Sequence, residues 1–252
     1  MDTELKRIVK RESYRSYSKV DLIEPVDSGF VFIAAEVDSR LSFLPPSRTK
    51  RALLRDCKKF CELLAQRGDV RSAVTFKAFL IPPGKGEFLK RHPEVHIAKF
   101  DVTVLIETDS VESARQLRQD TDFLALEKRM REASHYTYLI TASNARRIGP
   151  VDHGRRGVFF FNYFFADDIE QNLAVWNYTA GWFEQETGLH NSTVLLPLAG
   201  EDSQYTIINH CRWDRLRDFF PSLLFKRSFR DYVEANFEAN HTAPIPVLYR
   251  LA

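Results

Sequence analysis

The sequence of 252 residues contains the same order of predicted elements twice. Residues 29–143 and residues 157–252 each predict the order strand, helix, strand, strand, helix, strand. Apolar runs of strand length indicate the strands, and apolar residues at helical spacing indicate the helices. Gly29 and Gly157 open the two halves at matching places. A repeated order of this kind is typical of an internal duplication, so the chain is predicted to fold as two related units.

Local signals set the expected boundaries in the first half. Ser47 is placed to open the first helix and Gly68 to close it, and Asp109 with Ser110 is placed to cap the second helix. In the strand expected over residues 95–107, His96, Ala98, Phe100, Val102, Val104 and Ile106 alternate with mainly polar residues, as in a strand with one buried face. The strands are expected over residues 29–37, 71–81, 95–107 and 136–141.

The second half repeats these signals. Asp167 and Asp168 are placed to cap a helix that Gly188 ends, and Asp214 begins a long helix that Pro221 is expected to kink or interrupt. The strands are expected over residues 157–166, 192–198, 204–213 and 245–251.

A unit with this order forms a four-stranded antiparallel sheet with both helices on one face. Its other face is uncovered, and two units in one chain bury it by packing sheet against sheet. The predicted class is therefore α+β, with two tandem ferredoxin-like repeats that form one barrel. Residues 1–28 are expected to be a basic N-terminal extension and residues 144–156 an arginine-rich hinge. Internal pairing predicts a monomer with an internal pseudo-dimer, and a higher homo-oligomer stays open.

Composition limits the partners and the compartment. Lys and Arg total 36 against 34 Asp and Glu, so a net charge of +2 gives no reason to expect a nucleic-acid partner. No segment approaches the ~20 apolar residues of a membrane span, and the charged N-terminus has no apolar signal region. Three cysteines, Cys57, Cys61 and Cys211, form neither a disulfide framework nor a zinc motif, so no metal is expected. A cytoplasmic location is the expectation.

Aromatic residues are the unusual part of the composition. They make up 13% of the chain, and 20 of them are Phe. The segment GVFFFNYFFA at residues 157–166 and the last helix hold many of them. Rings are therefore expected to build the core or a pocket, and a hydrophobic or aromatic small molecule is the expected partner.

Three segments of the second half resemble a known family. INHCRWDRLRDFF, KRSFRDYVEANF and PVLYRL are similar to the second half of the antibiotic-biosynthesis-monooxygenase type of dimeric α/β barrel. The first half fits more loosely through VTVLIETDSVESARQL and TDFLALEKRM. The resemblance covers most of residues 29–251. It implies the barrel fold and a superfamily of cofactor-free oxygenases, haem-degrading enzymes, haem peroxidases, isomerases and non-catalytic proteins, so the reaction stays open.

Two residues match the family's pocket. The resemblance places Asn162 on the first strand of the second repeat and Trp213 at the end of its third strand, both lining a space between sheet and helices. An amide among six aromatic residues is costly to bury without a hydrogen-bond partner. Asn162 is thus expected either to bond to the backbone or to orient a ligand, and Trp213 to form the pocket wall.

His210 is the candidate acid–base residue, because a histidine exchanges protons near neutral pH. The structural alternative is a buried core or interface histidine. Strand alternation puts Asn209 and Trp213 on one face and His210 and Arg212 on the other. If the Trp213 face is covered by helices, His210 and Arg212 face the barrel centre, where His96 is a candidate neighbour.

Further residues complete the candidate site. By the resemblance, haem-degrading members carry an iron-ligating His on the last helix, where this chain has Ser228, so no cofactor is expected and haem is the third alternative. At the positions of repeat one that correspond to Asn162 and Trp213, the sequence has Ala34 and Thr108. This difference indicates a site that is kept in repeat two alone. The substrate-binding candidates are Phe160, Phe164, Trp176, Tyr178, Asn209 and Arg212.

Two functions from different classes follow. The first is a small-molecule enzyme that resembles the cofactor-independent monooxygenases, with an aromatic pocket in repeat two and Asn162, His210 and Trp213 as its catalytic candidates. The second is a non-catalytic ligand-binding or partner-binding protein on the same scaffold.

Overall fold

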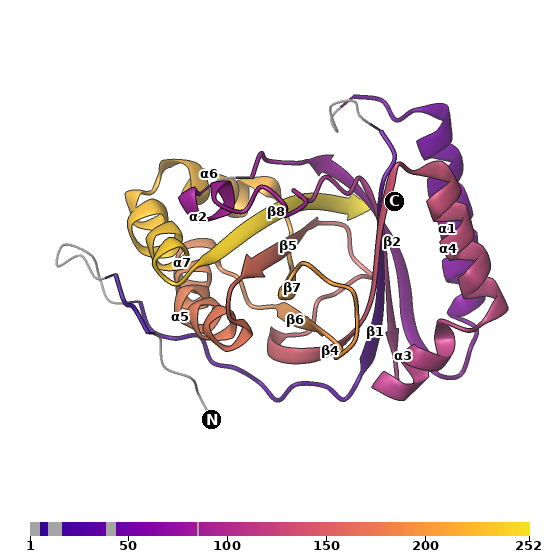
Figure 1. The fold of residues 1–252 in the computed structure, drawn as a ribbon, viewed down its shortest axis with the longest axis horizontal. Coiled ribbons are helices and arrows are strands. Elements are labelled where there is room, and N and C mark those ends of the chain that lie inside the picture. Colours follow the sequence, from indigo (N-terminus) through magenta and orange to yellow (C-terminus); the bar gives the residue numbers. More distant parts are fainter. Residues whose placement is uncertain (1–5, 10–16, 39–43, 85) are drawn as a thin grey trace.

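Eight strands close into a single antiparallel barrel (Figure 1). A computed structural model describes residues 6–9, 17–38, 44–84 and 86–252. The strand order around the barrel is β1-β3-β2-β8-β5-β7-β6-β4. The first half supplies β4-β1-β3-β2 and the second half β8-β5-β7-β6, which is the same ferredoxin-like order twice. The halves join along β2–β8 and β4–β6, so the predicted intramolecular barrel is confirmed.

In the first half, most elements lie where the sequence predicts them. Ser47 accepts a hydrogen bond from the backbone of Lys50 and caps the first helix. The second predicted helix is two helices, because Asp120 provides a new N-cap inside it. The elements are β1 (Gly29–Glu36), α1 (Arg48–Leu64), β2 (Val70–Leu80), α2 (Glu87–Lys90), β3 (Val102–Thr108), α3 (Val111–Leu117), α4 (Thr121–Ala133) and β4 (Tyr136–Gly149).

The prediction of a strand from residue 95 is wrong for its first seven residues, since β3 begins at Val102. The preceding segment has no regular structure, yet Val95, Ala98 and Phe100 belong to the buried cluster of the barrel interior. Their burial comes from packing against the barrel rather than from pairing in a sheet.

In the second half, the helix after β7 is broken into short pieces. Pro221 stands in the first turn of one piece, where its missing N–H costs nothing, and a π-helix follows. The elements are β5 (Val158–Ala166), α5 (Ile169–Thr187), β6 (Ser192–Pro197), β7 (Ile207–Trp213), η1 (Leu216–Asp218), α6 (Phe220–Phe225), η2 (Phe229–Glu234), α7 (Ala235–Ala239) and β8 (Thr242–Leu251).

β4 is longer than expected and takes over part of the predicted hinge. Its first half pairs with β1, and its second half pairs with β6, where Arg146 faces Val194 and Arg147 faces Thr193. The arginine-rich segment 144–149 is therefore strand. The irregular link between the halves is residues 150–157. Within residues 144–149, Ala145 and Ile148 are buried. The arginines beside them led to the prediction of an exposed hinge.

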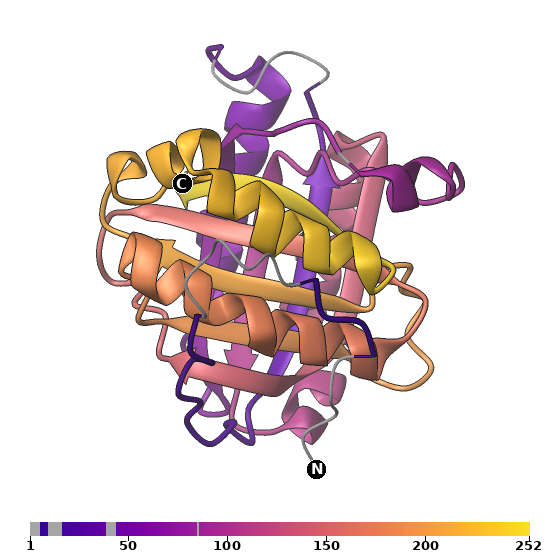
Figure 2. The same cartoon turned by 90° about the vertical axis from the view of Figure 1, so that its left-hand side faces the viewer.

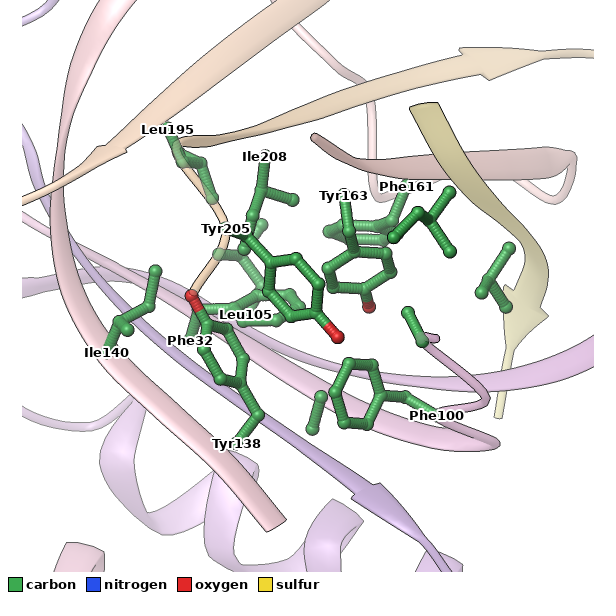
Figure 3. Packing of buried hydrophobic residues seen from close by; sticks show 14 of the residues in the cluster. Phe32, Phe100, Leu105, Tyr138, Ile140, Phe161, Tyr163, Leu195, Tyr205 and Ile208 are labelled. Carbon is green, nitrogen blue, oxygen red and sulfur yellow. The ribbon is translucent and has the colours of Figure 1, made fainter. Parts of the chain in front are cut away.

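The barrel interior is filled by aromatic rings from both halves (Figure 3). Phe32 of β1 lies with its ring centroid 5.5 Å from that of Phe161 on β5. Phe100 lies 5.2 Å from Tyr163 and 5.8 Å from Tyr138. Ring pairs at such distances add to the gain from burial, so this cluster holds the two sheets together. α1, α3 and α4 cover one outer side of the barrel, and α5, α6 and α7 cover the other, where the short helix α2 of the first half also lies (Figure 1).

Candidate functional site

A cavity of about 760 Å³ lies on the helix-covered face of the second sheet. Its floor is formed by β5 and β8, its wall by α6, η2 and α7, and one side by residues 80–83 and Gly86. The lining is mostly apolar, and its charged side chains among the described residues are Arg230, Glu234 and Glu238 of the wall helices. Volume and lining are those of a small-molecule site.

Two prolines explain why β8 leaves space here. Pro244 and Pro246 line the cavity, and they lack the N–H that a second neighbouring strand would require. β8 pairs with β5 from Thr242 to Tyr249 but with β2 only from Leu248 to Leu251. β2 itself stops at Leu80, ahead of Pro82 and Pro83. The free first half of β8 thus borders the cavity instead of another strand.

The wall of the cavity is an irregular helical segment. The π-helix η2 places one residue more in each turn than an α-helix, and such segments are frequent at functional sites. η2 and α7 present Val233 and Phe237 to the cavity. A wall made of short pieces cannot fill the space above the sheet as one continuous helix would.

Asn162 is the polar side chain that β5 contributes to the lining of this cavity. It is 7% exposed, and its Oδ1 has no hydrogen-bond partner among the described residues. Asn209 lies opposite it on β7, on the same face of the sheet. The Oδ1 of Asn209 accepts a hydrogen bond of 2.5 Å from Ser192 Oγ. Of these paired amides, Asn162 alone keeps a buried acceptor without a partner, and such a group is costly unless a ligand or water satisfies it.

A second, small cavity of about 20 Å³ adjoins the first, and both are lined by Asn162, Phe160, Phe183 and Phe237. Its volume holds about one water molecule. Most predicted site residues lie around it. Its lining includes Phe160, Asn162, Phe164, Trp176, Asn209 and Trp213.

Trp213 forms a rigid wall of the small cavity. Its indole Nε1 donates to the carbonyl oxygen and to Oγ1 of Thr187, each at 3.2 Å. Its ring stacks on Phe219 with centroids 4.3 Å apart. Because the indole N–H is already used, Trp213 can shape the site but has no free donor for a ligand.

His210 lies on the opposite face of β7, inside the barrel. Its ring stacks on Phe161 with centroids 4.0 Å apart, and its Nε2 lies 2.8 Å from Nε2 of His153. Burial, and then the neighbouring His153, hold the pKa of His210 well below its usual value. Burial also lowers the pKa of His153 to about 4. Both rings are neutral at pH 7, and His210 does not reach either cavity.

Two other candidates lie away from the cavities. Arg212 shares the barrel-side face with His210 and donates to Asp214 Oδ1 at 2.7 Å and to the carbonyl of Arg156 at 2.6 Å. Tyr178 stacks on Tyr232 with centroids 5.1 Å apart. His96 bonds to Glu36 at 2.7 Å, and no recorded contact joins it to His210.

The register corrects the comparison of the two repeats. Gly29 pairs with Thr108, and Val158 pairs with Trp213, so Ile33 rather than Ala34 corresponds to Asn162. An alignment of the repeats that matches Gly29 with Gly157 is shifted by one residue on this strand. A shift of one residue moves each side chain to the other face of the sheet. Ala34 points into the barrel.

Repeat one is apolar where repeat two carries its facing amides. The pair that corresponds to Asn162 and Asn209 is Ile33 and Val104. Both belong to the packed cluster under the first-half helices. The polar site is therefore confined to repeat two.

The residues around the large cavity do not fit a haem. Ser228, at the position of the family's iron ligand, accepts a hydrogen bond of 3.0 Å from Trp182 Nε1. Among the described residues that line the cavity, none is His, Cys, Met or Tyr, the side chains that bind haem iron axially. Across the described ranges, no group of three His, Cys, Asp or Glu side chains is placed to hold a metal ion.

Solved structures share this fold over most of their length. An anthrone oxidase-like protein superposes with a TM-score of 0.64 at 12% identity, covering 90% of this chain and 92% of that one. A candidate monooxygenase from Fusobacterium nucleatum superposes with a TM-score of 0.52 at 7% identity, covering 90% of this chain and 95% of that one. A mutant chlorite dismutase from Candidatus Nitrospira defluvii superposes with a TM-score of 0.50 at 11% identity, covering 90% of this chain and 92% of that one.

The chain therefore has the fold of the ferredoxin-like dimeric α/β barrels, with both units in one polypeptide, as the sequence predicts. At these identities the likeness establishes the fold. Neither the family models nor the curated proteins that we compared with the sequence match it. In the described parts of the chain, no helix has the length and apolar character needed to cross a membrane.

Proposed function

We propose that the large cavity of repeat two binds an apolar small molecule, with Asn162 as its polar contact. Asn162 lines an apolar cavity of about 760 Å³, and its buried amide oxygen has no hydrogen-bond partner among the described residues; these two observations support this function. A ligand with one hydroxyl or N–H group would satisfy Asn162 while its apolar body gains from burial. An exclusively apolar ligand would leave the oxygen unsatisfied.

The reaction we propose is a cofactor-independent oxidation by O2. The substrate first loses a proton from an activated carbon, and the resulting anion reduces O2. In the net reaction a methylene becomes a carbonyl, one oxygen atom enters the product and the other leaves as water. Asn162 would position the substrate by accepting a hydrogen bond at Oδ1 from a hydroxyl group of the substrate. His210 lies across the sheet, so the lining carboxylates Glu234 and Glu238 are the proposed proton acceptors.

The name of one structural neighbour suggests a first substrate to test. That neighbour is an anthrone oxidase-like protein, and an anthrone has the activated methylene that this reaction needs. Oxygen uptake after addition of an anthrone measures the reaction. The alternative, a non-catalytic binding protein, predicts binding of aromatic ligands without oxygen uptake.

Filling the cavity tests the site. Ala235 lines it and is partly exposed, so A235W can direct an indole into the space. Ala239 lies on the same helix, is also partly exposed and does not line the cavity, which makes A239W the matched control. We expect A235W to weaken binding of 2-naphthol at least tenfold and A239W to leave it unchanged. Equal binding by both variants would contradict the proposed site.

A further inference from the structure

The N-terminal extension lies across α5 and across η2 and α7 of the cavity wall. Figure 2 shows its described residues on the outer side of α5 and α7. Residues 6–9 contact α5 and α7, residues 17–20 contact α5 and η2, and we name these two segments the strap. Val20 is buried in the same cluster as Trp182 and Phe237.

Two asparagines on the wall bind the backbone of the strap. Asn240 Oδ1 accepts from the N–H of Arg7, and its Nδ2 donates to the carbonyl of Arg7. Asn236, one turn earlier, makes the same pair of contacts with Val9. Alternate residues of an extended peptide present their N–H and C=O to the same side, so this spacing fits a peptide held in extended form.

The α5 side contributes further contacts to the strap. Gln171 Oε1 accepts from the backbone N–H of Lys6 at 3.0 Å. At Gly181 the strap approaches so closely that a Cβ would lie 1.8 Å from the carbonyl oxygen of Ser18. Tyr17 lies with its ring 4.8 Å from that of Tyr232 and donates to Glu186. Both helices are therefore shaped to receive this segment.

The same wall segment carries strap contacts on one face and cavity lining on the other. Tyr232, Asn236 and Asn240 meet the strap. Val233 and Phe237 line the cavity. α7 has 5 residues and is too short to be stable without tertiary contacts. Its position over the cavity thus depends on what holds its outer face.

We infer that the strap is a latch that controls access to the cavity. Asn236 and Asn240 hold it through its backbone N–H and C=O groups. With residues 6–9 docked, α7 is fixed over the cavity and ligand exchange is slow. With these residues released, α7 loses its outer contacts and the wall opens. This inference rests on the proposed function, because it describes control of the same site.

A deletion of residues 1–9 tests the latch without changing any wall residue. In stopped-flow experiments, we expect the shortened chain to release 2-naphthol roughly ten times faster than the full chain, because the hydrogen bonds to Asn236 and Asn240 are lost. A synthetic peptide of residues 1–9, added in trans, should slow release again. The same peptide with N-methyl groups at Arg7 and Val9 lacks both donors and should have no effect.

Hydrogen exchange at the backbone amides of α7 gives a second readout that needs no ligand. We expect faster exchange in the shortened chain and protection on addition of the unmodified peptide. Equal release and exchange in the two chains would overturn the latch and leave the cavity site standing. If the N-methylated peptide also slowed the release of 2-naphthol, the strap would not be held through the backbone N–H groups of Arg7 and Val9. If A235W did not weaken the binding of 2-naphthol, the proposed site would be wrong. The hydrogen exchange of α7 would still show whether the strap holds this helix.

Discussion

Asn162 and Asn209 face each other across β5 and β7, yet the Oδ1 of Asn209 is bonded to Ser192 and the Oδ1 of Asn162 has no partner in the described residues. The two amides have the same chemistry and opposite roles. One stabilises the sheet, and the other is kept in the cavity at a cost in stability.

Leucine substitutions should therefore change stability in opposite directions. N162L removes an unsatisfied acceptor and should leave the free energy of unfolding unchanged or raise it by up to ~1 kcal/mol. N209L leaves the buried Ser192 hydroxyl without its acceptor and should lower it by ~1–3 kcal/mol. Urea unfolding of both variants measures the difference. A large loss of stability in N162L would mean that its amide has a structural partner.

Gly181 should resist a substitution that normally stabilises helices. Replacement of Gly by Ala inside a helix gains about 1 kcal/mol. At Gly181 the new methyl group would overlap the carbonyl oxygen of Ser18, so G181A should displace the strap and speed its cleavage by a protease. Gly68 has no atom within 4 Å of its Cβ position, and G68A is the control. Unchanged cleavage in G181A would show that the strap is not docked there.

The histidine pair in the barrel should make the protein sensitive to acid. Burial lowers the pKa of His153 to about 4 and that of His210 well below 6.5, so the unfolded chain binds more protons than the folded one between these values. Stability should fall as the pH drops from about 6.5 to about 4. The H153F/H210F double variant should lose much of this slope in thermal unfolding at several pH values. An unchanged slope would assign the pH dependence to other groups.

Haem should not bind specifically. Ser228 is bonded to Trp182, and no axial ligand lines the large cavity among the described residues. Titration with haemin should give no saturable shift of the Soret band. A one-to-one shift would show that another residue ligates the iron and would favour a haem enzyme.

The duplication and the order of helices and strands along the chain could be predicted because they depend on hydrophobic periodicity and capping residues, which are local. Ser47, Asp168 and Gly188 act at the helix ends where the sequence places them. The face of each residue on β7 also followed from alternation, with Trp213 toward the helices and His210 in the barrel.

Other features depend on contacts between distant segments and could not be predicted. β4 extends to Gly149 because β6 of the other half pairs with it. Ile33, not Ala34, matches Asn162, since register is fixed by pairing and not by distance from a glycine. The sequence predicts a pocket in repeat two but not its extension over β8, although Pro244 and Pro246 in a strand pattern are a signal for a stretch of β8 that pairs on one side alone.

The most direct test of the central claim compares two ligands of similar shape on two proteins. If the cavity of repeat two binds its ligand through Asn162, wild-type protein should bind 2-naphthol about tenfold or more tightly than naphthalene, because only the naphthol hydroxyl satisfies Oδ1. In N162L the two affinities should become equal, with naphthalene binding retained. An unchanged preference for 2-naphthol in N162L would contradict this account of the site.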